Sequence, residues 1–378
     1  MKPAIHRRSP GARCGFSHVG PGAEAFCGQI GINSGEFRRC ALELSVRRRS
    51  LIMRAFWHDS MSVRPIEYKE KSMATARGLM QRLAHASTRV IAVSRGDAFP
   101  FYYVSEYPKS GGTWLSRMLA DAMQLPFPQR SIFPLGFSCV IQNHWGYSPR
   151  LSRCVYLHRD GRDVMVSYFF HTMLHISRGQ SPWAREKARE FDRLFGKGFD
   201  PENTVELLPK FIENAFRNPR GARLNWARHV ESWLPARGRP LFSFVSYSEL
   251  RNDCAGALQR VLREIGREDV PEVRIHEAVE RFSMKRMTGR SEGQEDRGHY
   301  IRKGAVGDWR NHFSRDAAEV FDDLAGDALV ALGYEPDRDW VRRGDFAGDV
   351  ERAVQGRVAG GTEAEERCQG AEREQIYG

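Results

Sequence analysis

The stretch FPFYYVSEYPKSGGTWLSRMLADAM, residues 99 to 123, decides the fold of this chain. It opens with the apolar and aromatic run Phe101 to Val104, which has the length and composition of a β-strand. Pro108 ends that run, and from Trp114 to Met123 apolar residues recur at helical spacing. The stretch therefore predicts a strand, a loop with the sequence YPKSGGTW, and a helix.

The loop has the features of a site for a phosphate-like anion. Gly111 and Gly112 let the backbone turn tightly and approach a ligand, and Ser110 or Thr113 is expected to cap the helix. Free N–H groups at a helix start attract anions, and Lys109 adds a positive charge beside them. The lysine precedes the glycines, unlike the pattern GxxxxGK[ST], which argues against a kinase or an ATPase. An ordinary glycine-containing turn is the alternative.

Strands and helices alternate along the rest of the central chain. Apolar runs of strand length end near Asn143, span Cys154 to Leu157, and span Leu241 to Tyr247. Helical spacing of apolar residues follows within 164–170, 172–238, 253–265, 273–282 and 315–332. This alternation predicts an α/β fold with a central parallel sheet flanked by helices.

Composition separates this central part from the two ends. Residues 1–85 are rich in Gly, Arg and Ser, which predicts a disordered tail or an over-long start. Residues 342–378 are acidic and rich in Gly, which predicts a second unstructured tail. The folded domain is expected to span residues 99–335.

Composition also excludes several classes of protein. No apolar run reaches the ~18 residues of a membrane span, and the start lacks the apolar centre of a secretory signal, so a cytoplasmic protein is expected. The seven cysteines form no CxxC pair and no cluster with histidine, which favours free thiols and no metal. The net charge of +11 attracts phosphate-bearing partners, although scattered arginines are more typical of a solvated surface than of a specific nucleic-acid site.

A second anion-binding unit follows the strand that ends at Leu157. Arg159 stands at the strand exit, and Ser167 lies on the second turn of the following helix, so both can face one ligand. An arginine with a hydroxyl behind it can hold a phosphate. An ion pair between Arg159 and Asp160 or Asp163 is the alternative.

A third cationic unit and a histidine complete the set of candidates. Arg302, Lys303 and Gly304 place two positive charges beside a flexible backbone, as in an anion clamp. The polar loop at 288–298 before them fits either a mobile lid or an ordinary surface loop. His144 directly follows a strand, where loops carry the chemistry of open α/β sheets, although a structural histidine is the alternative.

Together these units require a ligand with two separated anionic ends, one at Lys109 and the other near Arg159. A nucleotide with a 5′ diphosphate-like group and a 3′-phosphate has this charge distribution, whereas ATP has one anionic end. The motifs YPKSGGTW (107–114), RDGRDVMVSYF (159–169) and RKGAVGDWRNHF (302–313) resemble, in this order, those of sulfotransferases that use 3′-phosphoadenosine 5′-phosphosulfate (PAPS). The resemblance covers about residues 99–335 and implies a P-loop-like three-layer sandwich.

The resemblance implies a role for each matching residue. The 5′ phosphosulfate would be held by Lys109, Ser110, Gly111, Gly112, Thr113 and Trp114, with Trp114 near the adenine. Arg159 and Ser167 would hold the 3′-phosphate, completed by Arg302, Lys303 and Gly304, and Tyr247 would lie near the adenine. His144 would take the proton from a hydroxyl or amine of the acceptor, and Lys109 would neutralise the leaving oxygen. PAPS would be the co-substrate, and no metal is required.

Two departures from the family pattern bear on the site. Gly112 stands where the family usually has Thr or Ser, which removes one hydroxyl contact. The segment from His144 to Arg159 is shorter than in the animal cytosolic enzymes, which leaves His171 as a second candidate base. A protein that binds the nucleotide or an anionic polymer without catalysis is therefore the alternative function.

The acceptor is expected to be a small molecule, apolar or aromatic, because aromatic residues surround the inferred site in sequence. Each of them is equally consistent with a place in the core, and the oligomeric state is left open. These residues are Phe133, Phe137, Trp145, Tyr147, Phe169 and Phe170.

Overall fold

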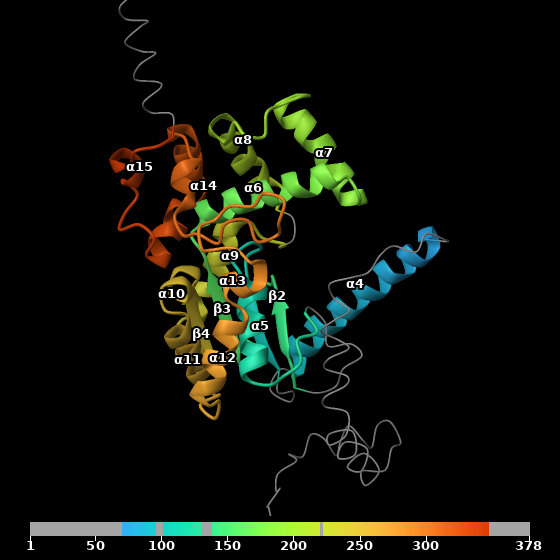
Figure 1. Ribbon diagram of the computed structural model, residues 1–378, viewed down its shortest axis with the longest axis vertical. Coiled ribbons are helices and arrows are strands. Elements are labelled where there is room, and N and C mark those ends of the chain that lie inside the picture. Colours follow the sequence, from blue (N-terminus) through green and yellow to red (C-terminus); the bar gives the residue numbers. More distant parts are fainter. Residues whose placement is uncertain (1–69, 96–100, 130–137, 220–221, 348–378) are drawn as a thin grey trace, which may run out of the picture. The chain divides into compact units, whose positions relative to one another are not determined.

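The computed structural model describes residues 70–95, 101–129, 138–219 and 222–347 (Figure 1). Contacts divide the chain after Leu79, and the fold described below belongs to the unit that follows. Helix α4 (Glu70–Arg95) crosses this division.

Both boundaries of the folded region differ from those that the composition predicts. Residues 70–85, for which it predicts disorder, are helical, while residues 1–69 lie outside the described ranges. At the other end Phe346 is buried, so the folded part continues past residue 342. The rest of the second predicted tail, residues 348–378, also lies outside the described ranges.

Four parallel strands form the sheet, in the order β2-β1-β3-β4. They are β1 (Tyr102–Glu106), β2 (Val140–Asn143), β3 (Cys154–His158) and β4 (Phe242–Ser246). Val104 of β1 pairs with Val155 of β3, and Leu157 of β3 pairs with Val245 of β4. Almost every strand residue is buried, as in a parallel sheet that is covered on both faces. The predicted α/β class is confirmed.

Helices cover both faces of this sheet (Figure 1). One face packs on α5 (Gly112–Ala122), α11 (Cys254–Glu264) and α12 (Glu272–Arg281). On the opposite face, Tyr156 stacks on Trp233 of α9 (Trp226–Trp233), with ring centroids 4.9 Å apart. Successive side chains of a strand point to opposite faces, so Val155 and Tyr156 belong to different cores.

A third core lies among four helices that connect β3 to β4 and one helix that follows β4. These are α6 (Gly161–Arg178), α7 (Pro182–Phe195), α8 (Thr204–Arg217), α9 and α14 (Arg315–Leu332), which gather at one end of the sheet in Figure 1. The short elements are α10 (Tyr247–Asn252), α13 (Met284–Thr288), α15 (Trp340–Arg343) and the 3-10 helices η1 (Leu234–Ala236) and η2 (Asp308–Asn311). Within the described ranges, no helix has both the length and the apolar character needed to cross a membrane.

The parallel arrangement brings the candidate loops to one edge of the sheet. Lys109 follows β1, His144 follows β2, Arg159 follows β3 and Tyr247 follows β4. The carboxyl ends of parallel strands lie at the same edge, which is where ligands bind in open α/β sheets. The fold therefore gathers residues that are far apart in the sequence.

Candidate functional site

A cavity of about 200 Å³ lies at this edge of the sheet. All three sequence motifs contribute to its lining. Of the residues that the sequence predicts to bind the nucleotide, those that line it are Lys109, Gly111, Gly112, Thr113, Trp114, Arg159, Ser167, Tyr247, Arg302, Lys303 and Gly304. Ser110 and His144 are not part of the lining.

The first motif forms a tight loop between β1 and α5. Lys109 has φ 75° and Gly111 has φ 103°, both in the left-handed region, and Gly111 is the N-cap of α5. The predicted side-chain cap is wrong. Thr113 donates its hydroxyl hydrogen to Gln142 over 3.0 Å, and the Ser110 hydroxyl is buried with no hydrogen-bond partner in the described part of the chain. Instead the Glu106 carboxylate accepts the hydrogen bond from the backbone N–H of Gly112.

Lys109 projects into the cavity beneath an aromatic ring. Its Nζ lies 4.2 Å from the centroid of the Tyr300 ring, a cation–π contact. Burial and the nearby Arg159 lower the pKa of Lys109 to about 8, and Glu106 acts in the opposite direction. The Lys109 side chain therefore loses its positive charge as the pH rises through about 8, where most proteins remain folded.

Arg159 links the first and third motifs. Its side chain is buried, and its guanidinium donates to the carbonyl oxygens of Lys109 over 3.3 Å and of Ala305 over 3.0 Å. The predicted alternative is also present, because Arg159 lies 3.7 Å from the Asp163 carboxylate. Asp160 pairs with Arg162 instead. Arg159 thus has a neutralising partner and still faces the cavity.

An aromatic wall closes one side of the cavity. Trp114 and Tyr247 meet edge to face, with ring centroids 5.9 Å apart. The Tyr247 hydroxyl donates to the carbonyl of Gly304 over 3.2 Å, and the Arg159 guanidinium lies 4.4 Å from the Tyr247 ring centroid. Trp114 donates its indole N–H to the carbonyl of Phe282 over 2.9 Å. Such a wall has a flat apolar face that a nucleobase could contact.

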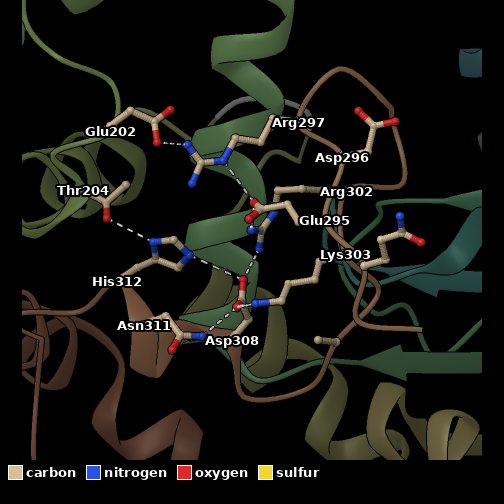
Figure 2. Close-up of polar contacts among 12 residues, drawn as sticks. Glu202, Thr204, Glu295, Asp296, Arg297, Arg302, Lys303, Asp308, Asn311 and His312 are labelled. Carbon is tan, nitrogen blue, oxygen red and sulfur yellow. Dashed lines mark hydrogen bonds and ion pairs between the residues drawn. The ribbon is translucent and has the colours of Figure 1, made fainter. Parts of the chain in front are cut away.

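Arg302 and Lys303 point toward the buried carboxylate of Asp308 (Figure 2). Lys303 Nζ lies 2.5 Å from Asp308 Oδ1, and Arg302 pairs with both Asp308 and Glu295. Burial would raise the pKa of Asp308, but hydrogen bonds from His312, Lys303 and Arg302 outweigh it and hold that pKa well below its usual range. The two cations of the third motif are therefore already partly neutralised.

The same network ties the segment to the helical core. His312 Nε2 lies 3.5 Å from Asp308 Oδ2, while its Nδ1 lies 3.0 Å from the Thr204 hydroxyl at the start of α8. Figure 2 also shows Arg297 between Glu202 and Glu295. These contacts restrain the loop that the composition describes as either a lid or a surface loop.

His144 directly follows β2 and is not part of the cavity lining. Its Nδ1 is 3.1 Å from the carbonyl oxygen of Glu106 and 4.0 Å from the Glu106 carboxylate. His171, the second candidate base, lies with its ring 5.4 Å from Tyr300 and 4.5 Å from His175. Burial, Lys109 and His175 lower the pKa of His171 to about 3.

The candidate acceptor aromatics that the structure describes pack outside the cavity lining. Tyr147 lies against Trp233, and Phe169 is fully buried in the helical core. Trp145 packs near Tyr103 on the face of the sheet that α9 covers. None of the four described candidates lines the cavity; they are Trp145, Tyr147, Phe169 and Phe170, whereas Phe133 and Phe137 lie outside the described residues.

Several lining residues were not predicted from the sequence. They are Glu106, Arg117, Arg251, Phe282, Met284, Met287, Tyr300, Ile301 and Ala305. Glu106 could have been identified from the sequence, because a negatively charged residue directly before a loop that binds anions is unusual. Arg251 follows Tyr247 by one helical turn and could have been placed on the same face of α10.

Comparisons with known proteins agree with the motif pattern. A family model described as a sulfotransferase domain matches residues 148–333, which contain the second and third motifs. Human Sulfotransferase 2B1 is 25% identical over 261 residues, which cover 58% of this chain and 63% of that protein. Human Sulfotransferase 2A1 is 25% identical over 268 residues, which cover 61% of this chain and 84% of that protein. The match to Sulfotransferase 2B1 thus spans less than two thirds of the relative's length.

Two solved structures also resemble the chain. Mouse sulfotransferase SULT7A1 complexed with PAP aligns with a TM-score of 0.44 at 19% identity, covering 65% of this chain and 95% of that one. Retinol dehydratase in complex with androsterone and the inactive cofactor PAP aligns with a TM-score of 0.45 at 18% identity, covering 65% of this chain and 85% of that one.

Proposed function

We propose that this chain is a sulfotransferase and that it transfers the sulfuryl group of PAPS to a hydroxyl or amine of a small acceptor, as its similarity to the sulfotransferase domain model and to the curated sulfotransferases suggests. The observation that carries this proposal is the cavity itself. Lys109, Arg159 and Arg302 come from three distant parts of the chain and line one space. A donor with two anionic ends accounts for such a distribution of positive charge.

In this proposal the donor lies across the cavity. The 5′ phosphosulfate contacts Lys109 and the backbone of the YPKSGGTW loop, at the start of α5. Arg159 and Ser167 hold the 3′-phosphate, with Arg302, Lys303 and Gly304 beside them. The adenine lies against Trp114 and Tyr247.

The transfer is an in-line displacement on sulfur. A new bond forms between the acceptor oxygen or nitrogen and sulfur while the bond from sulfur to the phosphate oxygen breaks, which leaves 3′-phosphoadenosine 5′-phosphate (PAP). Sulfuryl transfer resembles phosphoryl transfer in that positioning and charge stabilisation supply most of the catalysis. Lys109 neutralises the charge that develops on the leaving oxygen.

His144 is the proposed general base. The contact of its Nδ1 with the Glu106 carbonyl favours the tautomer that carries the proton on Nδ1, which leaves the Nε2 lone pair to accept a proton. His171 is the weaker candidate, since a pKa of about 3 leaves little tendency to accept a proton at neutral pH.

The direct test uses labelled PAPS with a panel of phenols, sterols and glycosides. Transfer of label to at least one acceptor is expected, with His144→Ala reducing the rate by about 100-fold or more while PAP still binds. His171→Ala serves as the matched control. Unchanged turnover in His144→Ala would refute the assignment of the base.

Binding of the nucleotide without catalysis is a second candidate function. The position of His144 favours it, because this proposed base is not part of the cavity lining, whereas the cationic residues proposed to bind the nucleotide are. This alternative predicts that PAP raises the melting temperature while no acceptor in the panel is sulfated.

A further inference from the structure

Glu106 is a buried carboxylate inside the proposed donor site. Only 3% of its surface is exposed, and it lines the cavity. One carboxylate oxygen accepts the hydrogen bond from the Gly112 N–H, and the other accepts a hydrogen bond from the Gln142 side chain over 2.6 Å. Two donors of this kind hold a carboxylate in a fixed orientation.

Glu106 also accounts for the glycine at position 112. A Cβ atom built at Gly112 would overlap with the carboxyl group of Glu106. The backbone of Gly112 does not have the left-handed conformation that would itself require glycine. The carboxylate therefore fills the space that a side chain at position 112 would take.

The same carboxylate faces both proposed catalytic side chains. Its charge counteracts the lowering of the Lys109 pKa by burial. His144 Nδ1 lies 4.0 Å from the carboxylate and 3.1 Å from the carbonyl oxygen of the same residue. A histidine that accepts a proton becomes positively charged, and a carboxylate at this distance stabilises that charge.

We propose that Glu106 is a positioning residue of the transfer reaction, which replaces the missing side chain at position 112 and supports His144 as the base. This inference rests on the proposed sulfotransferase function. Its consequence is a compromise between binding and catalysis. The negative charge weakens binding of the anionic nucleotide, and it stabilises the protonated His144 that forms during transfer.

Glu106→Gln tests this compromise because it keeps the shape and removes the charge. PAP affinity is expected to rise by about tenfold and kcat to fall by about tenfold or more. Glu268→Gln, at an exposed site away from the cavity, is the matched control. A role limited to packing would not raise affinity while lowering turnover. Affinity and kcat that fall together, or that both stay unchanged, would overturn the proposal.

A double-variant cycle tests the pairing of Glu106 with Gly112 independently of activity. Gly112→Thr alone is expected to lower both the melting temperature and PAP affinity, because the new side chain collides with Glu106. The double variant Gly112→Thr with Glu106→Ala lacks the colliding carboxyl group, and its PAP affinity is expected to be at least tenfold higher than that of Gly112→Thr alone. Additive effects in the cycle would contradict the pairing.

The wild-type protein separates the two possible failures. If it binds PAP and transfers label but the cycle is additive, the proposed function stands and the role of Glu106 is wrong. If it does not bind PAP, both are wrong.

Discussion

The charge on Lys109 should impose an upper pH limit on nucleotide binding. Burial and Arg159 lower its pKa to about 8, from 10.5 for an ordinary lysine. Its charged fraction then falls from roughly nine tenths at pH 7 to roughly one tenth at pH 9. If PAP binds the charged form, affinity should fall about tenfold over this interval. The phosphates of PAP keep their charge there, because their second ionisation lies near pH 6.

Calorimetric titration with PAP at pH 7, 8 and 9, in two buffers of different ionisation enthalpy, measures this effect. A bound anion raises the lysine pKa, so proton uptake on binding should be largest between about pH 8 and 9. Lys109→Arg is the matched variant, because an arginine stays charged throughout, and its affinity should be nearly independent of pH over this range. A wild-type affinity that is constant from pH 7 to 9, or a Lys109→Arg variant with the same slope as wild type, would refute the reasoning.

Three further outcomes follow from the contacts of the site. Tyr300→Ala removes the ring above Lys109. The gain in hydration opposes burial, the largest cause of the lowered Lys109 pKa, and should outweigh the lost cation–π contact, so the fall in PAP affinity should move above pH 8 in the same titration; an unmoved or lowered midpoint would contradict this. Asp308→Asn leaves Arg302 and Lys303 without their shared carboxylate, so the free energy of unfolding measured in urea should fall by roughly 3 kcal/mol. A change within experimental error would argue against the network in Figure 2. Arg162→Met leaves buried Asp160 without its partner and should lower the free energy of unfolding by about 3–5 kcal/mol. PAP affinity, measured at a low temperature where the variant is folded, should be retained, and a loss of affinity there would place Arg162 in the site.

Local pattern was sufficient for elements whose signal lies within a short window. The strand, loop and helix of residues 99–123 appear as β1, the YPKSGGTW loop and α5, and the expected helix at 315–332 is α14. Burial on both faces gives a parallel strand a continuous apolar run, which is why β3 could be located. Composition misjudged α4, since residues 70–85 are helical despite their polar character.

Contacts between distant segments could not be predicted in this way. The N–H of Gly112, at the start of α5, donates to Glu106 at the end of β1, whereas local rules predict a side-chain cap from Ser110 or Thr113. The pairing of Arg302 and Lys303 with Asp308 depends on how the loop before η2 folds back on itself. Phe169 belongs to the helical core because α6 turns that face toward α7 and α8, which the spacing of aromatic residues cannot reveal.

The account depends on three segments of this chain binding the two anionic ends of one adenosine nucleotide. A crystal structure of the complex with PAP tests it most directly. It should place the 5′-phosphate against Lys109 and the N–H groups at the start of α5, with the 3′-phosphate within hydrogen-bond distance of Arg159 and Ser167. PAP bound outside this cavity, or with its 3′-phosphate turned away from Arg159, would contradict the claim.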